Sequence, residues 1–159
     1  LEGIDYEGTL SESTLVIEPP HDLPGNDPVG VYRVFANADP VAALFVVTPR
    51  DGYSGPIRLL IGVMEDGTVS GVRVLAHRET AGLGDQIEET KSDWILTFAG
   101  LSLDDPPAAA WSIRSDGGAF DQMTGASITS RSVVKAVKET LVYFGENRAA
   151  VYARVADNE

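Results

Sequence analysis

The chain has 159 residues with 24 acidic and 12 basic side chains, so its formal net charge is −12, and this excludes a nucleic-acid binder that works by neutralising phosphates. Its 43% hydrophobic content is typical of one globular domain, which we place at residues 1–159. The lack of cysteine excludes disulfides, iron–sulfur ligation, thiolate zinc sites and cysteine nucleophiles, so a redox role would need a non-protein cofactor.

Membrane segments are not predicted within this sequence. No stretch approaches the roughly 18 consecutive apolar residues that a spanning helix needs. The longest apolar run, residues 41–47, has the length of a strand. The sequence begins at Leu1 without an initiator Met or a signal region, which suggests that an N-terminal segment was removed, and a lost membrane anchor remains open.

The first half of the chain predicts a β-sheet. Runs rich in Val, Leu and Phe alternate with turn clusters containing Pro, Gly, Asn and Asp. The clearest signal is a hairpin over residues 57–76 whose turn is Glu65-Asp66-Gly67. The other predicted strands are 14–18, 31–36 and 41–48.

The second half turns helical. Residues 84–98 predict an imperfect amphipathic helix interrupted near Ser92, and a short strand is predicted at 111–114. Apolar residues recur at helical spacing from Arg131 onward, which predicts a long C-terminal helix that Gly145 would break or bend. The expected fold is therefore a single α+β domain with an antiparallel or mixed sheet and a long C-terminal helix packed on it.

Common catalytic and metal-binding patterns are missing. His21 and His77 have no partner at ligand spacing, so no metal site is predicted. Gly82-Leu83-Gly84 resembles the start of a dinucleotide loop, but Ile87 stands at the third glycine position. The segment 125–129 ends in Thr rather than the Gly of a hydrolase elbow. We therefore name no catalytic residue.

The segment 121–130, Asp-Gln-Met-Thr-Gly-Ala-Ser-Ile-Thr-Ser, precedes the predicted C-terminal helix and concentrates four hydroxyl groups. One interpretation is helix capping, in which Thr129 or Ser130 accepts hydrogen bonds from the first backbone N–H groups. Another is an anion site, because the helix dipole and unpaired N–H groups favour a phosphate where Gly125 and Ala126 allow close approach. From the residues alone capping is favoured, and both remain open.

Three motifs carry a resemblance to a known family. Asp121-x-x-Thr-Gly-Ala-Ser127 resembles the flavinylation motif of the FMN-binding domain family. The segment 77–84, His-Arg-Glu-Thr-Ala-Gly-Leu-Gly, is similar to its second signature, and 52–57, Gly-Tyr-Ser-Gly-Pro-Ile, to its element ahead of the hairpin. The resemblance covers residues 45–145 and is closest to members that serve in Rnf-type ion-translocating electron-transport complexes. Those of sodium-pumping NADH:quinone reductases are more distant.

In that family a flavin transferase joins the FMN phosphate through a phosphodiester to the last hydroxyl residue of the motif, which is Ser127 here. The usual acceptor is Thr, but the chemistry needs only a hydroxyl. Ala81 replaces the usual Pro, which loosens the loop before Gly82 without removing a donor. The resemblance further implies that the transferase requires Asp121, which on its own predicts a turn in which its side chain bonds nearby N–H groups.

The resemblance implies a flavin site built from two segments. The phosphodiester would lie at the positive end of the helix, where the N–H groups of Thr129 and Ser130 are expected to be free. The isoalloxazine ring would lie against the loop from Glu79 to Gly84, although Glu79 taken alone is a surface acid. The predicted cofactor-binding residues are Ser127 as the covalent acceptor with Thr124, Gly125, Ala126, Ile128, Thr129, Glu79, Thr80, Gly82, Leu83 and Gly84.

The residues around these segments are expected to have structural or surface roles rather than functional ones. His77 is expected to be structural because no acid–base partner can be named beside it. Tyr53, Trp94 and Trp111 are expected to be core or pocket-rim aromatics. Lys91, Lys135 and Lys138 could offset phosphate charge, but solvated helix faces explain them equally well.

The function implied by the resemblance is electron transfer on covalently bound FMN, with no acid–base chemistry by side chains. The implied partners are the membrane subunits of the complex and the flavin transferase. The implied location is the periplasmic face of the bacterial inner membrane, held by an N-terminal helix that precedes this sequence. Two alternatives remain: a module that binds FMN or another phosphate ligand noncovalently, and a non-redox extracytoplasmic interaction domain.

Overall fold

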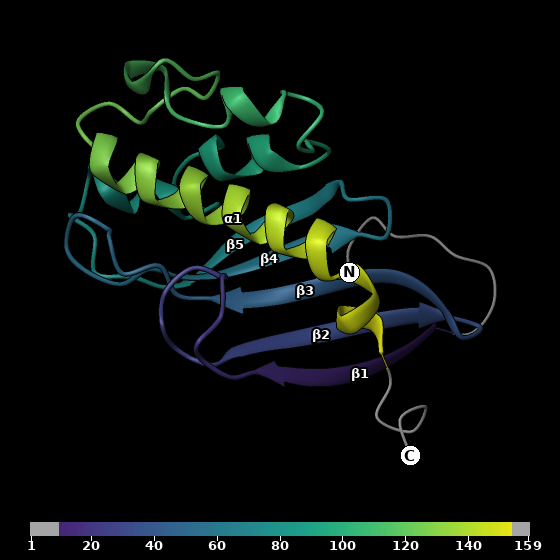
Figure 1. Cartoon of the computed structure of the whole chain (residues 1–159). Helices are drawn as coiled ribbons and strands as arrows, with labels where there is room; N and C mark the ends of the chain where they lie inside the picture. Colours follow the sequence, from purple (N-terminus) through teal and green to yellow (C-terminus); the bar gives the residue numbers. More distant parts are fainter. Residues whose placement is uncertain (1–9, 154–159) are drawn as a thin grey trace.

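The sheet is built from strands joined in sequence order, and each strand is antiparallel to the next (Figure 1). The computed structural model describes residues 10–153, so the predicted domain limits at 1 and 159 lie outside it. The α+β prediction is confirmed, with a wholly antiparallel sheet. The strands are β1 (Leu10–Ile17), β2 (Val29–Ala36), β3 (Asp39–Val47), β4 (Arg58–Met64) and β5 (Val69–Ala76).

Alternation of side chains gives the sheet one covered face and one open face. In β3, Phe45 and Val47 are fully buried, whereas Leu44 and Val46 between them are half-buried. Successive residues of a strand point to opposite faces, so this pattern places the main core on one side, while Leu44 packs against a smaller buried cluster of Val34, Val41 and Ala42. The predicted hairpin is confirmed as β4 and β5, where the Gly67 N–H donates to the Met64 carbonyl across the turn.

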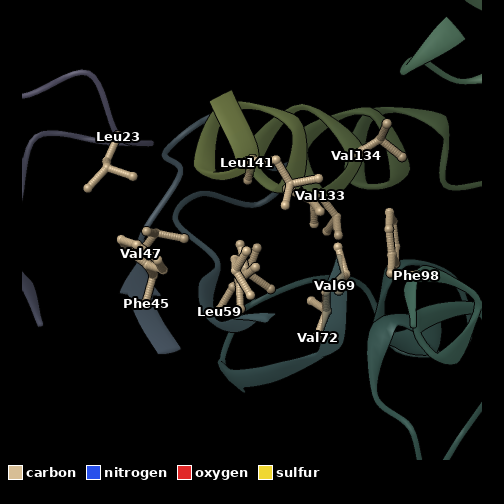
Figure 2. Packing of buried hydrophobic residues seen from close by; sticks show 14 of the residues in the cluster. Leu23, Phe45, Val47, Leu59, Val69, Val72, Phe98, Val133, Val134 and Leu141 are labelled. Atoms are coloured by element: carbon tan, nitrogen blue, oxygen red, sulfur yellow. The ribbon is translucent and has the colours of Figure 1, made fainter. Parts of the chain in front are cut away.

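Helix α1 (Ser127–Tyr152) lies across the covered face of the sheet (Figure 1). Its buried residues Val133, Val134 and Leu141 join strand residues in one continuous core (Figure 2). The long C-terminal helix is thus confirmed, but it begins four residues earlier than predicted. Its non-helical backbone is at Asn147, two residues beyond the predicted position at Gly145, which stays within the helix.

We call residues 77–126 the connecting segment, because they link β5 to α1. The segment lies beside β5 and the N-terminal half of α1, drawn in teal to green in Figure 1. It contains four short 3-10 helices. They are η1 (Gly84–Ile87), η2 (Trp94–Phe98), η3 (Ala108–Ala110) and η4 (Arg114–Asp116).

Two predictions for the connecting segment were wrong. The amphipathic helix expected over 84–98 is two separate 3-10 helices, η1 and η2, although the chain is non-helical at the interruption expected near Ser92. The strand expected at 111–114 is reduced to one bridge between Ile113 and Phe120.

An aromatic cluster gives the connecting segment its own part of the core. The rings of Trp111 and Phe120 have centroids 4.6 Å apart, and Phe98 lies 5.4 Å from both Phe120 and Trp94. Trp111 is buried and Trp94 is half-buried, and both contact Phe98, in agreement with the expectation of core or pocket-rim aromatics. Within residues 10–153, no helix combines the length and the hydropathy required to cross a bilayer.

Candidate functional site

A cavity of about 410 Å³ lies where the connecting segment meets the N-terminal end of α1. Ligand sites are typically about 300–1,000 Å³, so this volume is within the range for a small molecule. Segments far apart in the sequence contribute to it. The lining residues are Tyr53, Thr80, Leu83, Gly84, Gly125, Ala126, Ser127, Ile128 and Thr129.

Ser127 is the first residue of α1 and is half-buried in the wall of this cavity. The N–H groups of a helix's first turn have no acceptor one turn earlier, so those of Ser127, Ile128 and Thr129 are available for another partner. The preceding residue, Ala126, provides no side-chain cap. The hydroxyl therefore stands beside uncapped donors at the positive end of a 26-residue helix.

The capping interpretation was wrong, because both candidate hydroxyls bond elsewhere. Thr129 Oγ1 donates to Glu79, and Ser130 Oγ donates to the Ala126 carbonyl while accepting the Met123 N–H. The expectation that the Ser130 N–H is free was also wrong, since it donates to the Ala126 carbonyl at 3.0 Å. The buried Ser130 side chain instead fixes the turn that carries the motif.

Two glycines allow the walls of the cavity to approach each other. Gly125 has φ of +74°, and a Cβ built there would lie 3.0 Å from Cδ2 of Leu83. A Cβ at Gly84 would lie 2.7 Å from Cβ of Glu79 and 2.9 Å from Oγ1 of Thr129. Gly84 therefore has no room for a Cβ between Glu79 and α1, whereas a Cβ at Gly125 would require the exposed Leu83 side chain to shift.

Glu79 is buried, with a relative exposure of 7%, so its default interpretation as a surface acid was wrong. Its carboxylate accepts the N–H groups of Tyr53 and Ser54 at 2.9 and 2.8 Å. It also accepts the hydroxyl of Thr129 at 2.5 Å. One side chain thus joins three segments of the chain around the cavity.

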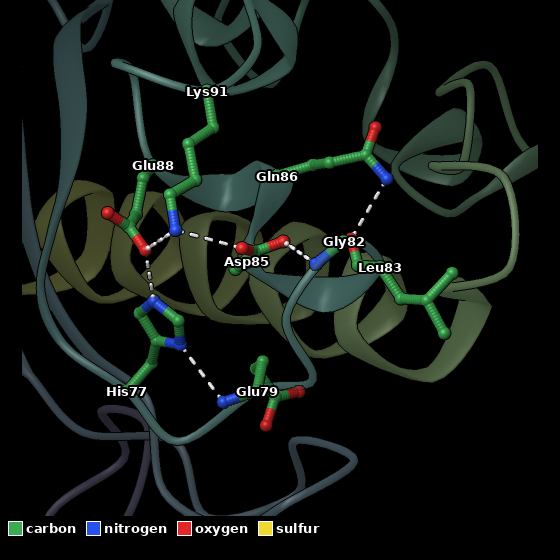
Figure 3. Close-up of polar contacts among 8 residues, drawn as sticks. All are labelled: His77, Glu79, Gly82, Leu83, Asp85, Gln86, Glu88 and Lys91. Carbon is green, nitrogen blue, oxygen red and sulfur yellow. Dashed lines mark hydrogen bonds and ion pairs between the residues drawn. The ribbon is translucent and has the colours of Figure 1, made fainter.

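A polar network holds the loop behind the cavity (Figure 3). Nδ1 of His77 accepts the Glu79 N–H at 2.9 Å, so the other ring nitrogen carries the proton and donates to Glu88 at 2.8 Å. His77 therefore has an acidic partner, contrary to our expectation. Its two ring contacts both go to the protein, as expected of a structural histidine.

Lys91 extends the network to Asp85. Its ammonium group lies 2.9 Å from Asp85 and 3.4 Å from Glu88, and Asp85 also accepts the Gly82 N–H (Figure 3). The hydrogen bond from Lys91 lowers the pKa of Asp85, and the hydrogen bond from His77 lowers that of Glu88. The ionised form of both carboxylates is therefore favoured by these contacts.

The lining of the cavity carries no charge, although the whole chain carries −12. Two of the three lysines considered as phosphate partners are already paired, Lys91 with Asp85 and Lys135 with Asp51. Asp121 lies outside the cavity, largely exposed, with its carboxylate 2.5 Å from Nε of Arg114. Its expected turn with nearby N–H groups is replaced by this ion pair. Within residues 10–153 no three potential metal ligands cluster.

Comparison with known proteins connects this geometry to a family. The model of the FMN-binding domain matches residues 52–142, which include the cavity and all three motifs. The chain belongs to the FMN-binding domain family. The resemblance inferred from the motifs is therefore confirmed.

Relatives of this FMN-binding domain protein share one name, which identifies each of them as the G subunit of an ion-translocating oxidoreductase complex. The relative from Pseudoalteromonas atlantica is 43% identical, over 97% of this chain and 71% of its own length. That from Vibrio atlanticus is 42% identical over 94% and 71%, and that from Pseudomonas aeruginosa is 48% identical over 79% and 58%. The chain therefore also belongs to the family of these G subunits.

Most of the residues predicted for the site of this FMN-binding domain lie around one cavity. Thr80, Leu83 and Gly84 face the segment 125–129 across it, whereas Glu79, Gly82 and Thr124 do not line it. Tyr53 lines the cavity with 67% of its surface exposed, consistent with a rim aromatic. We had not assigned it to the flavin site, although it lies within the Gly-Tyr-x-Gly-Pro-Ile element that could have indicated it.

Proposed function

We propose that the chain is an electron-carrying flavoprotein subunit of an ion-translocating oxidoreductase complex, with FMN joined by a phosphodiester to Ser127. One observation carries this proposal. Ser127 opens onto a cavity that the two family motifs, more than 40 residues apart, build together. A capping serine would need no such cavity beside it.

The residues around Ser127 fit a singly charged phosphodiester better than free FMN. The positive end of α1 and the N–H groups of Ser127, Ile128 and Thr129 favour an anion there. No lining residue supplies a cation, so a phosphate monoester with nearly two negative charges would be poorly neutralised. A diester carries one charge, and a covalent bond retains it without an ion pair. This supports the covalent alternative over the noncovalent module.

The remaining lining residues suit a flat aromatic ring. Tyr53, Leu83 and Ile128 are 67%, 43% and 45% exposed, and such large apolar side chains gain by covering an apolar ligand. The hydroxyl of Thr80 can bond a polar ring edge. FMN, when bound, accepts and releases electrons singly or in pairs. The chain supplies attachment, orientation and exclusion of water.

Attachment requires an activated flavin nucleotide and a transferase. The oxygen of Ser127 forms a new bond to the flavin-bearing phosphorus, and the phosphoanhydride bond of the donor breaks. The hydroxyl proton leaves with the departing phosphate, and no electrons are transferred. The exposed Asp121 carboxylate lies six residues before Ser127 and is accessible to the transferase, which we propose recognises it.

The proposed partners follow from the relatives. Proteins 42–48% identical to this chain are named as subunits of an ion-translocating complex, so we propose the other membrane subunits as electron donor and acceptor. We further propose the periplasmic face of the inner membrane as its location, with an N-terminal helix preceding this sequence as the anchor. Covalent attachment would prevent loss of the cofactor in that compartment.

The decisive experiment is expression with a flavin transferase, followed by acid denaturation and intact-mass measurement. The wild-type pellet should remain yellow, and its mass should rise by one FMN less one water. Ser127→Ala should abolish both, whereas Ser127→Thr should retain them. Ser115→Ala is the control, since it removes an exposed serine hydroxyl outside the cavity.

Other outcomes would support the alternatives. Yellow colour that washes out on denaturation, with no mass change, would indicate a noncovalent flavin module. A colourless wild-type protein of unchanged mass would contradict the electron-carrier proposal and favour an interaction domain, for which captured partners would be the informative measurement.

A further inference from the structure

We infer that Glu79 is a positioning residue that holds the two walls of the flavin cavity in place through its carboxylate. That the cavity holds a flavin rests on the proposed function, whereas the positioning role of Glu79 rests on the hydrogen bonds of this chain. Glu79 does not line the cavity. Its contribution is made through Tyr53, Ser54 and Thr129 rather than through the flavin.

The carboxylate of Glu79 has only donors around it. Oε1 accepts the Tyr53 N–H at 2.9 Å and the Thr129 hydroxyl at 2.5 Å, and Oε2 accepts the Ser54 N–H at 2.8 Å. An ionised carboxylate is the one acidic or amide side chain with acceptors at both ends. Gln, which has the same shape, would place an NH₂ group against a donor. The site is therefore specific for a carboxylate.

The three donors belong to two walls of the cavity. Tyr53 lines the cavity, and Glu79 accepts its backbone N–H, so the carboxylate fixes the backbone at this part of the lining. Thr129 lies in the first turn of α1, two residues after Ser127, and also lines the cavity. Releasing the carboxylate would let the loop at 53–54 and the helix turn move independently.

The backbone of Glu79 is itself held by hydrogen bonds on the side away from the cavity. Its N–H donates to Nδ1 of His77, whose other nitrogen bonds Glu88, as Figure 3 shows. Its Cβ also lies so close to Gly84 that a Cβ built there would be 2.7 Å away, so the two residues pack directly against each other. The carboxylate is thus held on a rigid support, as a residue that orients others must be.

The experiment compares Glu79→Gln with Glu89→Gln, an exposed acid ten residues away on the connecting segment. In flavin-free full-length protein, amide hydrogen exchange at Tyr53 and Ser54 should become about tenfold faster or more in Glu79→Gln, as expected for loss of a hydrogen bond to a charged group. Glu89→Gln should leave it unchanged. This measurement needs no bound flavin.

In flavin-loaded protein, the fluorescence anisotropy of the flavin should fall in Glu79→Gln because the ring gains freedom on its tether. A merely structural role would lower stability without changing this signal below the unfolding temperature. Thr129→Val should reproduce the fall by removing one donor, and Thr129→Ser should restore the wild-type value. These Thr129 variants also provide the test if Glu79→Gln does not fold.

Each outcome separates the two proposals. Unchanged amide exchange in Glu79→Gln, or unchanged anisotropy in both Glu79→Gln and Thr129→Val, would overturn the role of Glu79 while leaving Ser127 as acceptor. A wild-type protein that takes up no flavin would instead overturn the proposed function, and faster exchange in Glu79→Gln would then support only its role in holding the two walls.

Discussion

The sheet with α1 and the connecting segment are held together in different ways. In the sheet, strand follows strand with continuous backbone pairing, and its apolar residues meet α1 in one core. The connecting segment, residues 77–126, has only short 3-10 turns and isolated bridges, and side chains such as His77, Asp85 and Ser130 accept hydrogen bonds from its backbone N–H groups. The first region provides a scaffold, and the second, with the first turn of α1, provides the site.

This difference suggests how the two regions respond to change. A repetitive, hydrophobically packed scaffold fails as a unit, because each strand depends on its neighbours. A segment held by individual hydrogen bonds and ion pairs can lose one of them and change its conformation only locally. The three predictions below test this contrast, from the largest expected effect to the smallest.

Phe45→Ala should disrupt both regions. Phe45 is fully buried in β3, and its ring meets Tyr143 of α1 edge-on at a centroid distance of 6.3 Å. Losing this ring should reduce the free energy of unfolding by about 3–5 kcal/mol, measured by denaturant titration. Leu44→Ala, on the open face, should cost clearly less. Hydrogen-exchange protection that persists in the connecting segment after its loss in the sheet would contradict this dependence.

Gly125→Ala should affect the site more than the fold. Its φ of +74° costs a non-glycine residue about 1–2 kcal/mol, and the added Cβ would press on Leu83. Gly67→Ala, in the β4–β5 turn, has a similar φ of +91° and open space around its Cβ. The two variants should lose similar stability in thermal unfolding, but only Gly125→Ala should lower the yield of flavin-bearing protein by mass spectrometry.

Lys91→Met should have the smallest effect, one that depends on pH. The folded-state pKa values of Asp85 and Glu88 lie below their ordinary values of 3.8 and 4.5, so these groups contribute stability above those values. That contribution is lost as the pH falls through the lowered pKa values. Lys91→Met should therefore have a lower melting temperature than wild type at about pH 7, and the gap should narrow as the pH falls below the ordinary values and through the lowered pKa values.

Lys138→Met, which removes a lysine of α1 outside this network, is the control for the loss of one positive charge. It should leave the pH dependence of the melting temperature unchanged. A gap between Lys91→Met and wild type that stays constant down to acid would show that the ion pairs are not its source.

The sequence predicted the scaffold well because its signals are local. The apolar run at 41–47 and the turn at Glu65-Asp66-Gly67 place β3, β4 and β5 within one or two residues. β1 begins four residues before its predicted start, because backbone pairing with β2 extends it through polar residues such as Ser11 and Glu12. Hydrophobic patterns cannot indicate a strand of that kind.

The motifs predicted residues that line the candidate site, but they did not predict the hydrogen bonds that hold those residues in place. The motifs indicated both walls of the cavity, including Ser127 and Leu83. The burial of Glu79 could not be predicted, because its donors come from residues 53–54 and 129, which only the fold brings together. The same holds for Ser130, which adjacent residues suggested as a cap and which instead bonds Met123 and Ala126.

The outer surface of this chain is strongly acidic, whereas the lining of the cavity is uncharged, so ionic strength should affect the two differently. Dissolved ions screen charges on the outer surface over about 8 Å at physiological salt, so the repulsion among exposed acids changes with the salinity of the medium. The lining of the cavity offers hydroxyl groups, backbone dipoles and apolar side chains, on which such screening has little influence. A ring held there, as the proposed function requires, would keep nearly constant surroundings when the ionic strength of the medium changes.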